Sequence, residues 1–365
     1  MRISLVLLLL LLTTQTGVSV AEPLIEEREF LTVELGHAPT PLETIIVKQE
    51  RSGRLPIALI THGTPRDRDA RAAKSAETML PQARDFAHRG WLAVGVVRRG
   101  FGHSQAGFVE GYDCRDPDYG RALQTAAEDL LAALHAVSMR PDADISRVIG
   151  VGASVGGAAM LTLASEHPPG LLAVVNISGG TGAYASGKNC SEDRLVDYFT
   201  HIGGAVRIPT IWLYAANDSY FAPALVRRLS DGFTAAGGAA ELHQFGSLKS
   251  DGHELWGAPD GRKLWLPALD RFLRAHQLPS WDMAAARSLT ARLSPAAQRI
   301  FADYLESGSE KAFAMAPSGF VGYWSGAGSA AEARAGAIRE CQKAGGINCA
   351  AVMEDFAAVS SRPAR

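Results

Sequence analysis

At the centre of the chain stands Arg147-Val148-Ile149-Gly150-Val151-Gly152-Ala153-Ser154-Val155-Gly156. After Arg147, residues 148–151 form an apolar run typical of a buried strand, and the small residues after Gly156 suit the start of a closely packed helix. The last five residues of the stretch fit G-x-S-x-G, in which a serine on a tight strand-to-helix turn holds its hydroxyl above the sheet. The pattern predicts a nucleophilic Ser154; the alternative is a glycine-rich turn that only packs closely.

Apolar runs and amphipathic segments alternate on both sides of this turn. Strands are expected over residues 29–34, 44–49, 55–60, 91–97, 148–151, 171–177, 210–214 and 240–245, and helices over 80–88, 121–137, 156–166, 192–201, 223–235 and 263–276. Such alternation predicts a mostly parallel sheet with helices on both faces. The first two strands mix polar and apolar residues, which suits an antiparallel edge. Chemistry in such sheets lies beyond the carboxyl ends of the strands.

Two partners for the serine follow later in the chain. Asp218 comes just after the strand at 210–214, and His253 lies in a loop after the strand at 240–245. Serine, acid and histidine in this order are typical of G-x-S-x-G hydrolases. We therefore expect His253 as general base and Asp218 as the acid that orients it. Asp218 also suits an Asx-turn or a helix cap, and Asp251 is the second candidate for the acid.

Such chemistry also needs two hydrogen-bond donors for the oxyanion of the tetrahedral intermediate. One is expected to be the backbone N–H of Val155, directly after the nucleophile. The other should come from the loop after the strand at 55–60, which reads Thr61-His62-Gly63-Thr64-Pro65. Because proline has no N–H, Thr64 is the predicted donor.

Several short motifs stand in a fixed order between residues 55 and 256. They are His62-Gly63-Thr64, Arg99-Gly100-Phe101-Gly102-His103-Ser104, Gly152-Ala153-Ser154-Val155-Gly156, Asn217-Asp218 and Gly252-His253. The set resembles the α/β-hydrolase superfamily and, within it, exported proteins similar to the dienelactone hydrolases. The resemblance implies an α/β-hydrolase fold. Dienelactone hydrolases proper use a cysteine nucleophile, so Ser154 favours ester or amide hydrolysis over lactone hydrolysis.

The substrate pocket is expected to be open. The segment between the strands at 171–177 and 210–214 holds about one helix, which leaves little room for the large lid that gates some lipases. Such a site suits small or polar acyl compounds, or extended peptides. His62, Tyr220 and Phe221 are predicted to line it.

Length and composition bound the class of protein. The 365 residues carry a formal net charge of −2, with 47% hydrophobic and 20% charged residues. These values are ordinary for a globular protein, and the charge argues against nucleic acid as a partner. Residues 1–21 combine Arg2, a leucine-rich core and the small residues Ser19 and Ala21, which predicts a cleaved signal peptide and a secreted or periplasmic protein. An uncleaved N-terminal anchor is the alternative.

Export sets the expectation for the cysteines. The chain has four, Cys114, Cys190, Cys341 and Cys349. Four cysteines allow three pairings, of which we favour Cys114–Cys190 and Cys341–Cys349 because each stays inside one predicted domain. No pattern of closely spaced cysteine or histidine ligands indicates a metal site, and no cofactor is expected.

Four segments are expected along the chain: the signal peptide at 1–21, a catalytic domain at 22–278, a helical linker at 279–308 and a small α+β module at 309–365. In the module, Phe320, Tyr323 and Trp324 either form its core or provide a face for contact with the cell envelope. The predicted function is hydrolysis of a small ester by an exported serine hydrolase. The alternatives are a serine peptidase or amidase with the same fold, and a non-catalytic relative that binds a ligand.

Overall fold

The computed structural model describes residues 23–51, 53–281 and 283–359. The predicted signal peptide at residues 1–21 lies outside the described residues. Within the described part of the chain, no helix combines the length and the apolar character that a membrane crossing requires.

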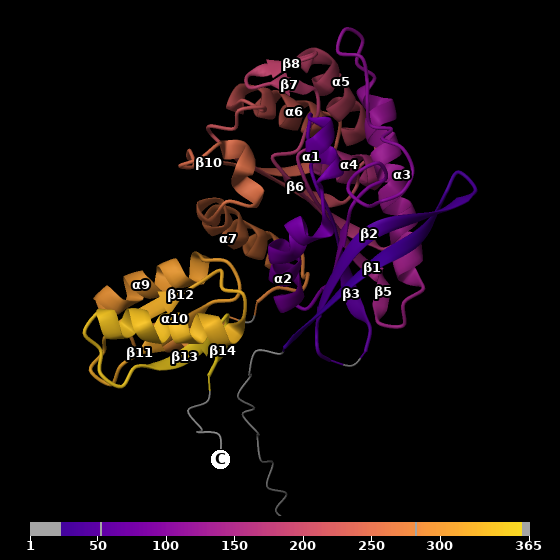
Figure 1. Cartoon of the computed structure of the whole chain (residues 1–365). Helices are drawn as coiled ribbons and strands as arrows, with labels where there is room; N and C mark the ends of the chain where they lie inside the picture. Colours follow the sequence, from indigo (N-terminus) through magenta and orange to yellow (C-terminus); the bar gives the residue numbers. More distant parts are fainter. Residues whose placement is uncertain (1–22, 52, 282, 360–365) are drawn as a thin grey trace, which may run out of the picture.

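One eight-stranded sheet forms the centre of the large domain (Figure 1). Its strands run in the order β1-β2-β4-β3-β5-β6-β9-β10. The pairs β1–β2 and β2–β4 are antiparallel, and all the other neighbours are parallel. Their bounds are β1 Leu24–Leu35, β2 Ala38–Gln49, β3 Leu55–Thr61, β4 Leu92–Val96, β5 Ala143–Ala153, β6 Leu171–Ile177, β9 Pro209–Ala215 and β10 Ala239–Phe245. The predicted strands and the antiparallel edge are confirmed.

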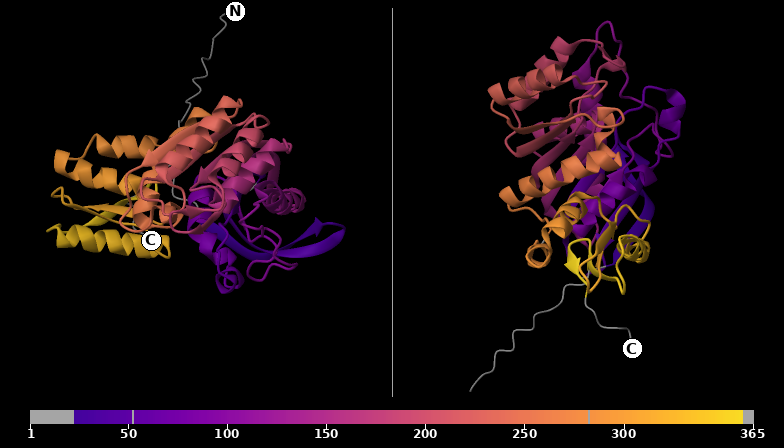
Figure 2. Two further views of the ribbon diagram at one scale, coloured as in Figure 1. Left: turned by 90° about the horizontal axis from the view of Figure 1, so that it is seen from above. Right: turned by 90° about the vertical axis from the view of Figure 1, so that its left-hand side faces the viewer.

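Helices cover both faces of this sheet (Figure 2). One face packs against α3 (Tyr119–Ser138), α4 (Val155–Ser165), α5 (Glu192–Gly203) and α6 (Pro223–Ala235). The other face packs against α2 (Leu80–His88) and α7 (Pro259–Ala275). Strands β3 and β4 are buried along their whole length and almost entirely apolar, because both of their faces are covered.

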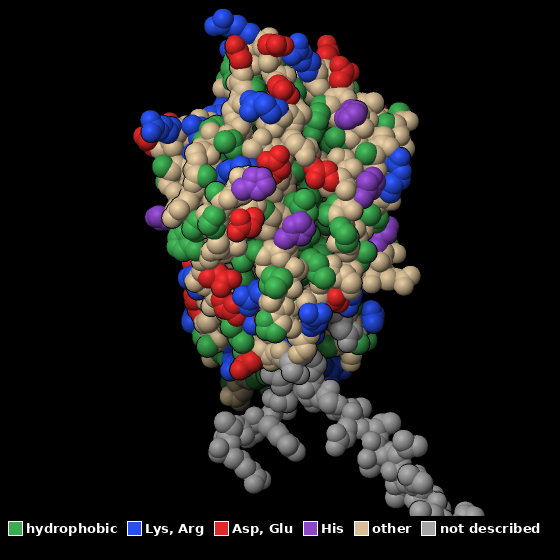
Figure 3. Space-filling model, turned by 90° about the vertical axis from the view of Figure 1, so that its right-hand side faces the viewer, with side chains coloured by type: hydrophobic (Ala, Val, Ile, Leu, Met, Phe, Trp, Pro, Cys, Tyr) green, Lys and Arg blue, Asp and Glu red, His purple; other side chains and the backbone are tan. Residues whose placement is uncertain are grey.

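Short elements at the carboxyl ends of the strands were not expected from the sequence. They are helix α1 (Arg68–Ala72), the 3₁₀ turns η1 (Ala76–Met79) and η2 (Gly252–Trp256), and the hairpin of β7 (Ala183–Ala185) and β8 (Lys188–Asn189). None of them is long enough to show a hydrophobic period. On the side of the molecule that lies at the right in Figure 1, where β1, β2 and α3 are found, acidic and basic side chains are interspersed (Figure 3).

The C-terminal module is a four-stranded antiparallel sheet in the order β12-β11-β13-β14, packed against helix α10. Its elements are β11 Ala312–Met315, β12 Val321–Trp324, α10 Ala330–Lys343, β13 Ala350–Glu354 and β14 Ala357–Ala358. Tyr323 packs against the module's core, whereas Phe320 and Trp324 are exposed.

The segment at 279–308 is helical, as expected, but it does not act as a spacer. It forms α8 (Ala284–Thr290) and α9 (Pro295–Glu306). Phe301 and Tyr304 of α9 share one apolar core with Phe313 and Met353 of the small sheet. The description as a linker is therefore corrected, because these helices supply apolar side chains that the small sheet alone lacks.

Buried charges join the module to the large domain. Asp85 of α2 accepts hydrogen bonds from Arg262 Nη2 of α7 at 2.6 Å and from Ser309 Oγ at 2.5 Å. Burial by itself would raise the pKa of Asp85, but Arg262 and Arg89 hold it below its ordinary value. The module is thus attached along α2 and α7.

Both predicted disulfides, Cys114–Cys190 and Cys341–Cys349, are present in the structure. The first spans 76 residues of sequence and the second spans 8. Cys114–Cys190 joins the loop before α3 to the loop before α5.

We expect the longer bridge to stabilise the fold more than the shorter one, because it removes more entropy from the unfolded chain. By loop length, the double variant Cys114→Ser/Cys190→Ser should lose about 4–5 kcal/mol of unfolding free energy, and Cys341→Ser/Cys349→Ser about 2–3 kcal/mol. Urea unfolding without reductant measures both. Equal losses, or a larger loss for the second variant, would contradict the expectation.

Candidate active site

Ser154 lies on the sharp turn between β5 and α4. Its backbone has φ 54° and ψ −125°, a region that costs a residue with a side chain on the order of 1–3 kcal/mol. A Cβ on Gly152 would lie 2.2 Å from the carbonyl oxygen of Gly156, and one on Gly156 would lie 2.5 Å from that of His62. The two motif glycines are therefore required by close backbone approaches, which permit the strained turn.

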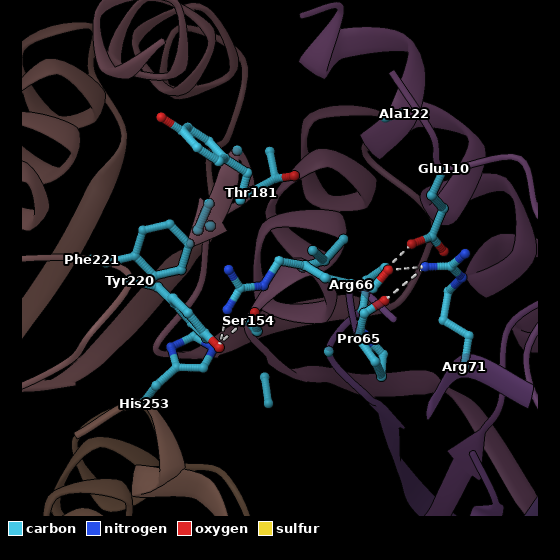
Figure 4. Close-up of a pocket in the computed structure, with 18 of the residues that line it drawn as sticks. Pro65, Arg66, Arg71, Glu110, Ala122, Ser154, Thr181, Tyr220, Phe221 and His253 are labelled. Atoms are coloured by element: carbon cyan, nitrogen blue, oxygen red, sulfur yellow. Dashed lines mark hydrogen bonds between the residues drawn. The ribbon is translucent and has the colours of Figure 1, made fainter. Parts of the chain in front are cut away.

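The structure brings Ser154, His253 and Asp218 together at the carboxyl ends of β5, β9 and β10. His253 Nε2 is 3.1 Å from Ser154 Oγ. His253 Nδ1 is 3.1 Å from each carboxylate oxygen of Asp218. The hydroxyl thus faces one ring nitrogen, and the carboxylate holds the other (Figure 4 shows Ser154 and His253).

Asp218 is held rigidly in place. Its Oδ1 accepts hydrogen bonds from the backbone N–H of Tyr220 at 2.9 Å and of Phe221 at 3.0 Å. The side chain is fully buried. Asp218 therefore forms the Asx-type turn and contacts the imidazole at the same time, and the two interpretations of this residue are compatible.

Asp251, the second candidate acid, lies beside the histidine but does not bond to its ring. Its Oδ1 accepts from the backbone N–H of Ser219 at 3.0 Å and of His253 at 2.9 Å, and its Oδ2 accepts from Ser219 Oγ. Burial alone would raise the pKa of Asp251, but these hydrogen bonds keep it below its ordinary value. The carboxylate joins the loop of Asp218 to the loop of His253.

The two predicted oxyanion donors lie close to the serine. Val155 begins α4, and the first N–H groups of a helix have no partner within the helix. Gly63, just before Thr64, is so near that an added Cβ would lie 2.8 Å from Ser154 Cβ. Neither the Val155 nor the Thr64 amide donates a hydrogen bond within the described part of the chain.

His62 does not line the substrate cavity, and that prediction is corrected. Its side chain is buried and accepts a hydrogen bond at Nε2 from the Arg98 N–H at 3.1 Å. Nδ1 therefore carries the proton and donates to the Gly63 carbonyl at 2.7 Å. Burial, followed by the charges of Arg98 and Lys74, holds the pKa of His62 well below its ordinary value. A neutral His62 thus supports the loop from inside.

A buried ion pair, which the sequence analysis missed, fixes the same loop. Arg98 Nε donates to Glu110 Oε1 at 2.5 Å, and Arg98 Nη1 donates to the His62 carbonyl at 2.6 Å. The Thr64 hydroxyl donates to the other oxygen of Glu110 at 2.6 Å. These contacts join the Thr64 loop to the loop after β4. The pairing has no sequence signal, because the partners meet only after the chain folds.

A cavity of about 830 Å³ opens beside Ser154 (Figure 4). Ser154, Val155, His253 and Thr64 line it, as do the predicted pocket residues Tyr220 and Phe221. The Cys114–Cys190 disulfide forms part of its wall. Lining residues that the sequence analysis missed include Arg66, Arg71, Lys74, Phe108, Tyr184 and Trp256. For Arg66, Arg71 and Lys74, the sequence signal was their position shortly after Thr64.

No group of His, Cys, Asp and Glu side chains suited to a metal ion occurs among residues 23–51, 53–281 and 283–359.

The strand order, the turn at Ser154 and the chain order of Ser154, Asp218 and His253 define an α/β-hydrolase fold. Solved structures similar to this chain include a candidate dienelactone hydrolase from Klebsiella pneumoniae (18% identity, 70% of this chain and 99% of that chain, TM-score 0.47). Others are the acetyl xylan esterase from Paenibacillus sp. R4 (16%, 70% and 89%, 0.49) and the acylaminoacyl peptidase from Pyrococcus horikoshii (17%, 71% and 43%, 0.47). No protein-family model and no curated protein matches the chain.

Proposed function

We propose that this protein is an exported serine hydrolase that cleaves carboxylic esters through an acyl-enzyme. The observation that carries the proposal is the 3.1 Å contact of His253 Nε2 with Ser154 Oγ, combined with the bond of Nδ1 to Asp218. A serine hydroxyl is a weak nucleophile near neutral pH, and a base at this distance supplies the activation that it needs.

The reaction follows from these contacts. Ser154 Oγ attacks the ester carbonyl while its proton moves to His253 Nε2, and Asp218 stabilises the imidazolium. The amides of Val155 and Thr64 bind the oxyanion of the tetrahedral intermediate. The intermediate expels the alcohol, which takes the proton from Nε2. His253 then takes a proton from a water molecule, which attacks the acyl-enzyme. The protonated His253 returns this proton to Ser154 Oγ as the carboxylic acid is released.

The elements around the cavity support compact or polar substrates. Between β6 and β9 the chain forms only the β7–β8 hairpin and α5, so the cover over the site is small. The Cys114–Cys190 bridge holds part of the wall in place. Export is supported by residues 1–21 and by the two disulfides, which persist in oxidising compartments.

The direct test is hydrolysis of p-nitrophenyl acetate, butyrate and octanoate by residues 22–365, together with labelling by a fluorophosphonate. We expect kcat/KM to fall as the acyl chain lengthens, and the label to be found on Ser154. Labelling without turnover of any ester would replace the esterase proposal with the peptidase or amidase alternative. Neither labelling nor turnover would support the non-catalytic, ligand-binding alternative.

A further inference from the structure

Three basic side chains line the cavity beside Ser154. Arg66 precedes α1, Arg71 lies in its last turn, and Lys74 follows it. All three come from the segment that directly follows the Thr64 loop. The cavity therefore has a cationic wall next to the predicted oxyanion donors.

Within the described residues, these three cations have no acidic partner. No carboxylate oxygen of residues 23–51, 53–281 or 283–359 lies within 4.0 Å of a side-chain nitrogen of Arg66, Arg71 or Lys74. Arg71 Nη1 donates to the carbonyls of Pro65 at 3.1 Å and Arg66 at 2.5 Å, and its guanidinium lies 4.4 Å from the centre of the Phe108 ring. These contacts orient the group without neutralising it.

Arg66 extends past Ser154 toward the other side of the cavity (Figure 4). Its guanidinium donates to the hydroxyl of Tyr220 and lies 4.4 Å from the centre of that ring. The Tyr220 ring in turn packs edge-on against the imidazole of His253, with 4.5 Å between ring centres. Arg66 therefore places a positive charge close to the reacting groups.

Lys74 gives the strongest indication that the cavity binds an anion. It is only partly exposed, and burial together with the nearby charge of Arg98 lowers its pKa. A cation in such a place is costly unless it meets an anion. A bound anion would supply the partner that the protein itself does not provide.

The acidic groups of the cavity do not balance this charge. Glu110 is held by Arg98 at 2.5 Å and by the Thr64 hydroxyl at 2.6 Å, so its charge is already paired. Glu254 lines the cavity from an exposed position on the His253 side. The wall formed by Arg66, Arg71 and Lys74 therefore keeps an excess of positive charge.

We propose that the substrate is an ester that carries an anionic group, which Arg71 and Lys74 bind while Arg66 adds a further positive charge beside Tyr220. This inference rests on the proposed function, because it assigns a substrate class to the same site. The anionic group lies either on the acyl part or on the alcohol part of the ester. The cationic wall attracts an anion in either position, so the test examines both.

The test compares anionic esters with neutral partners of nearly equal size. For the acyl part, the pair is p-nitrophenyl hydrogen adipate and p-nitrophenyl methyl adipate. For the alcohol part, the pair is 4-carboxyphenyl acetate and its methyl ester. Each kcat/KM is divided by the rate of hydroxide hydrolysis of the same compound, which removes the difference in leaving-group reactivity. The preference is the ratio of anionic to neutral ester.

We expect a preference of about 10- to 100-fold for the anionic ester in at least one pair, because hydrogen bonds to a charged group in a partly buried site stabilise binding by this amount. Lys74→Met and Arg71→Met should each reduce that preference about tenfold. The control Lys343→Met, in the exposed last turn of α10, should retain it. Raising NaCl from about 20 mM to about 500 mM should weaken the preference in the unmodified protein, which does not depend on any variant folding.

The outcomes separate this inference from the proposed function. Turnover of the neutral esters with no preference in either pair would overturn the anionic substrate and leave the esterase proposal standing. A preference that Lys74→Met and Arg71→Met leave unchanged would also overturn it. A preference in only one pair would assign the anion to the acyl or to the alcohol part. Absence of turnover for all four esters would contradict the esterase proposal, and with it this inference.

Discussion

Replacing Ser154 with alanine is expected to lower kcat for p-nitrophenyl acetate by about 10⁴- to 10⁶-fold, as loss of the nucleophile does in serine hydrolases. The physical reason is that no other hydroxyl faces His253 Nε2, which lies 3.1 Å from Ser154 Oγ, within the described residues. The p-nitrophenol release rate measures the loss, and the fluorophosphonate label should disappear in the variant.

Ser104 offers a matched control for this variant. It is a buried serine in a glycine-containing loop, but its hydroxyl donates to the Val97 carbonyl at 2.6 Å instead of facing a base. Ser104→Ala should keep kcat within about tenfold and lose about 1 kcal/mol of unfolding free energy. Full activity in Ser154→Ala, or loss of labelling only in Ser104→Ala, would show that the nucleophile is misassigned.

Ser154→Gly tests the strain at the same position. Glycine adopts a positive φ without the steric cost that a side chain incurs, so this variant should be inactive and also more stable than the unmodified protein by roughly 1 kcal/mol. Thermal unfolding measures the gain. A lower stability would mean that Ser154 contributes more through its contacts than its backbone costs.

Replacing Asp218 with asparagine is expected to lower kcat by about 10⁴-fold with little loss of stability. The amide oxygen can still accept the hydrogen bonds that Tyr220 and Phe221 donate to Oδ1 at 2.9 Å and 3.0 Å, so the loop should keep its shape. The amide NH₂ facing Nδ1, however, favours the tautomer that carries its proton on Nε2. That tautomer cannot take the proton of Ser154. The kcat of p-nitrophenyl acetate hydrolysis checks the expected loss of activity, and the unfolding free energy checks the retained stability.

Asp251→Asn is the matched control, because it changes the second candidate acid in the same way. Asp251 accepts from the backbone N–H of His253 and does not bond to the ring, so its amide can retain those contacts. We expect kcat to fall less than about tenfold. A large loss in Asp251→Asn and a small one in Asp218→Asn would exchange the roles of the two acids.

The chain order of the candidate catalytic residues was accessible from sequence for a local reason. G-x-S-x-G, an acid after one strand and a histidine after the next are each short patterns bound to a single turn or loop. The sequence favours Asp218 as the acid but does not exclude Asp251, because both residues lie in loops at the same end of the sheet. Only the folded geometry distinguishes them, since the ring of His253 bonds to Asp218 and its backbone to Asp251.

The role of His62 could not be inferred from its position in the motif. Its side chain points into the protein because it follows directly on the buried strand β3, where it meets the backbone of Arg98. Likewise, nothing in the local pattern showed that Arg98 and Glu110 would pair. Such contacts join loops that follow different strands, and their partners are set by how the sheet is assembled.

The alternation of apolar runs and amphipathic segments determined the layered sheet, because burial on one or both faces selects residues at a fixed period. The small residues around Ser154 determined the turn, because the backbone there leaves no room for side chains. Tertiary structure alone decided that α8 and α9 pack with the module, and that Arg66, Arg71 and Lys74 share one wall with no acidic partner among the described residues. These features depend on distances between segments far apart in sequence, which no local pattern of residues records.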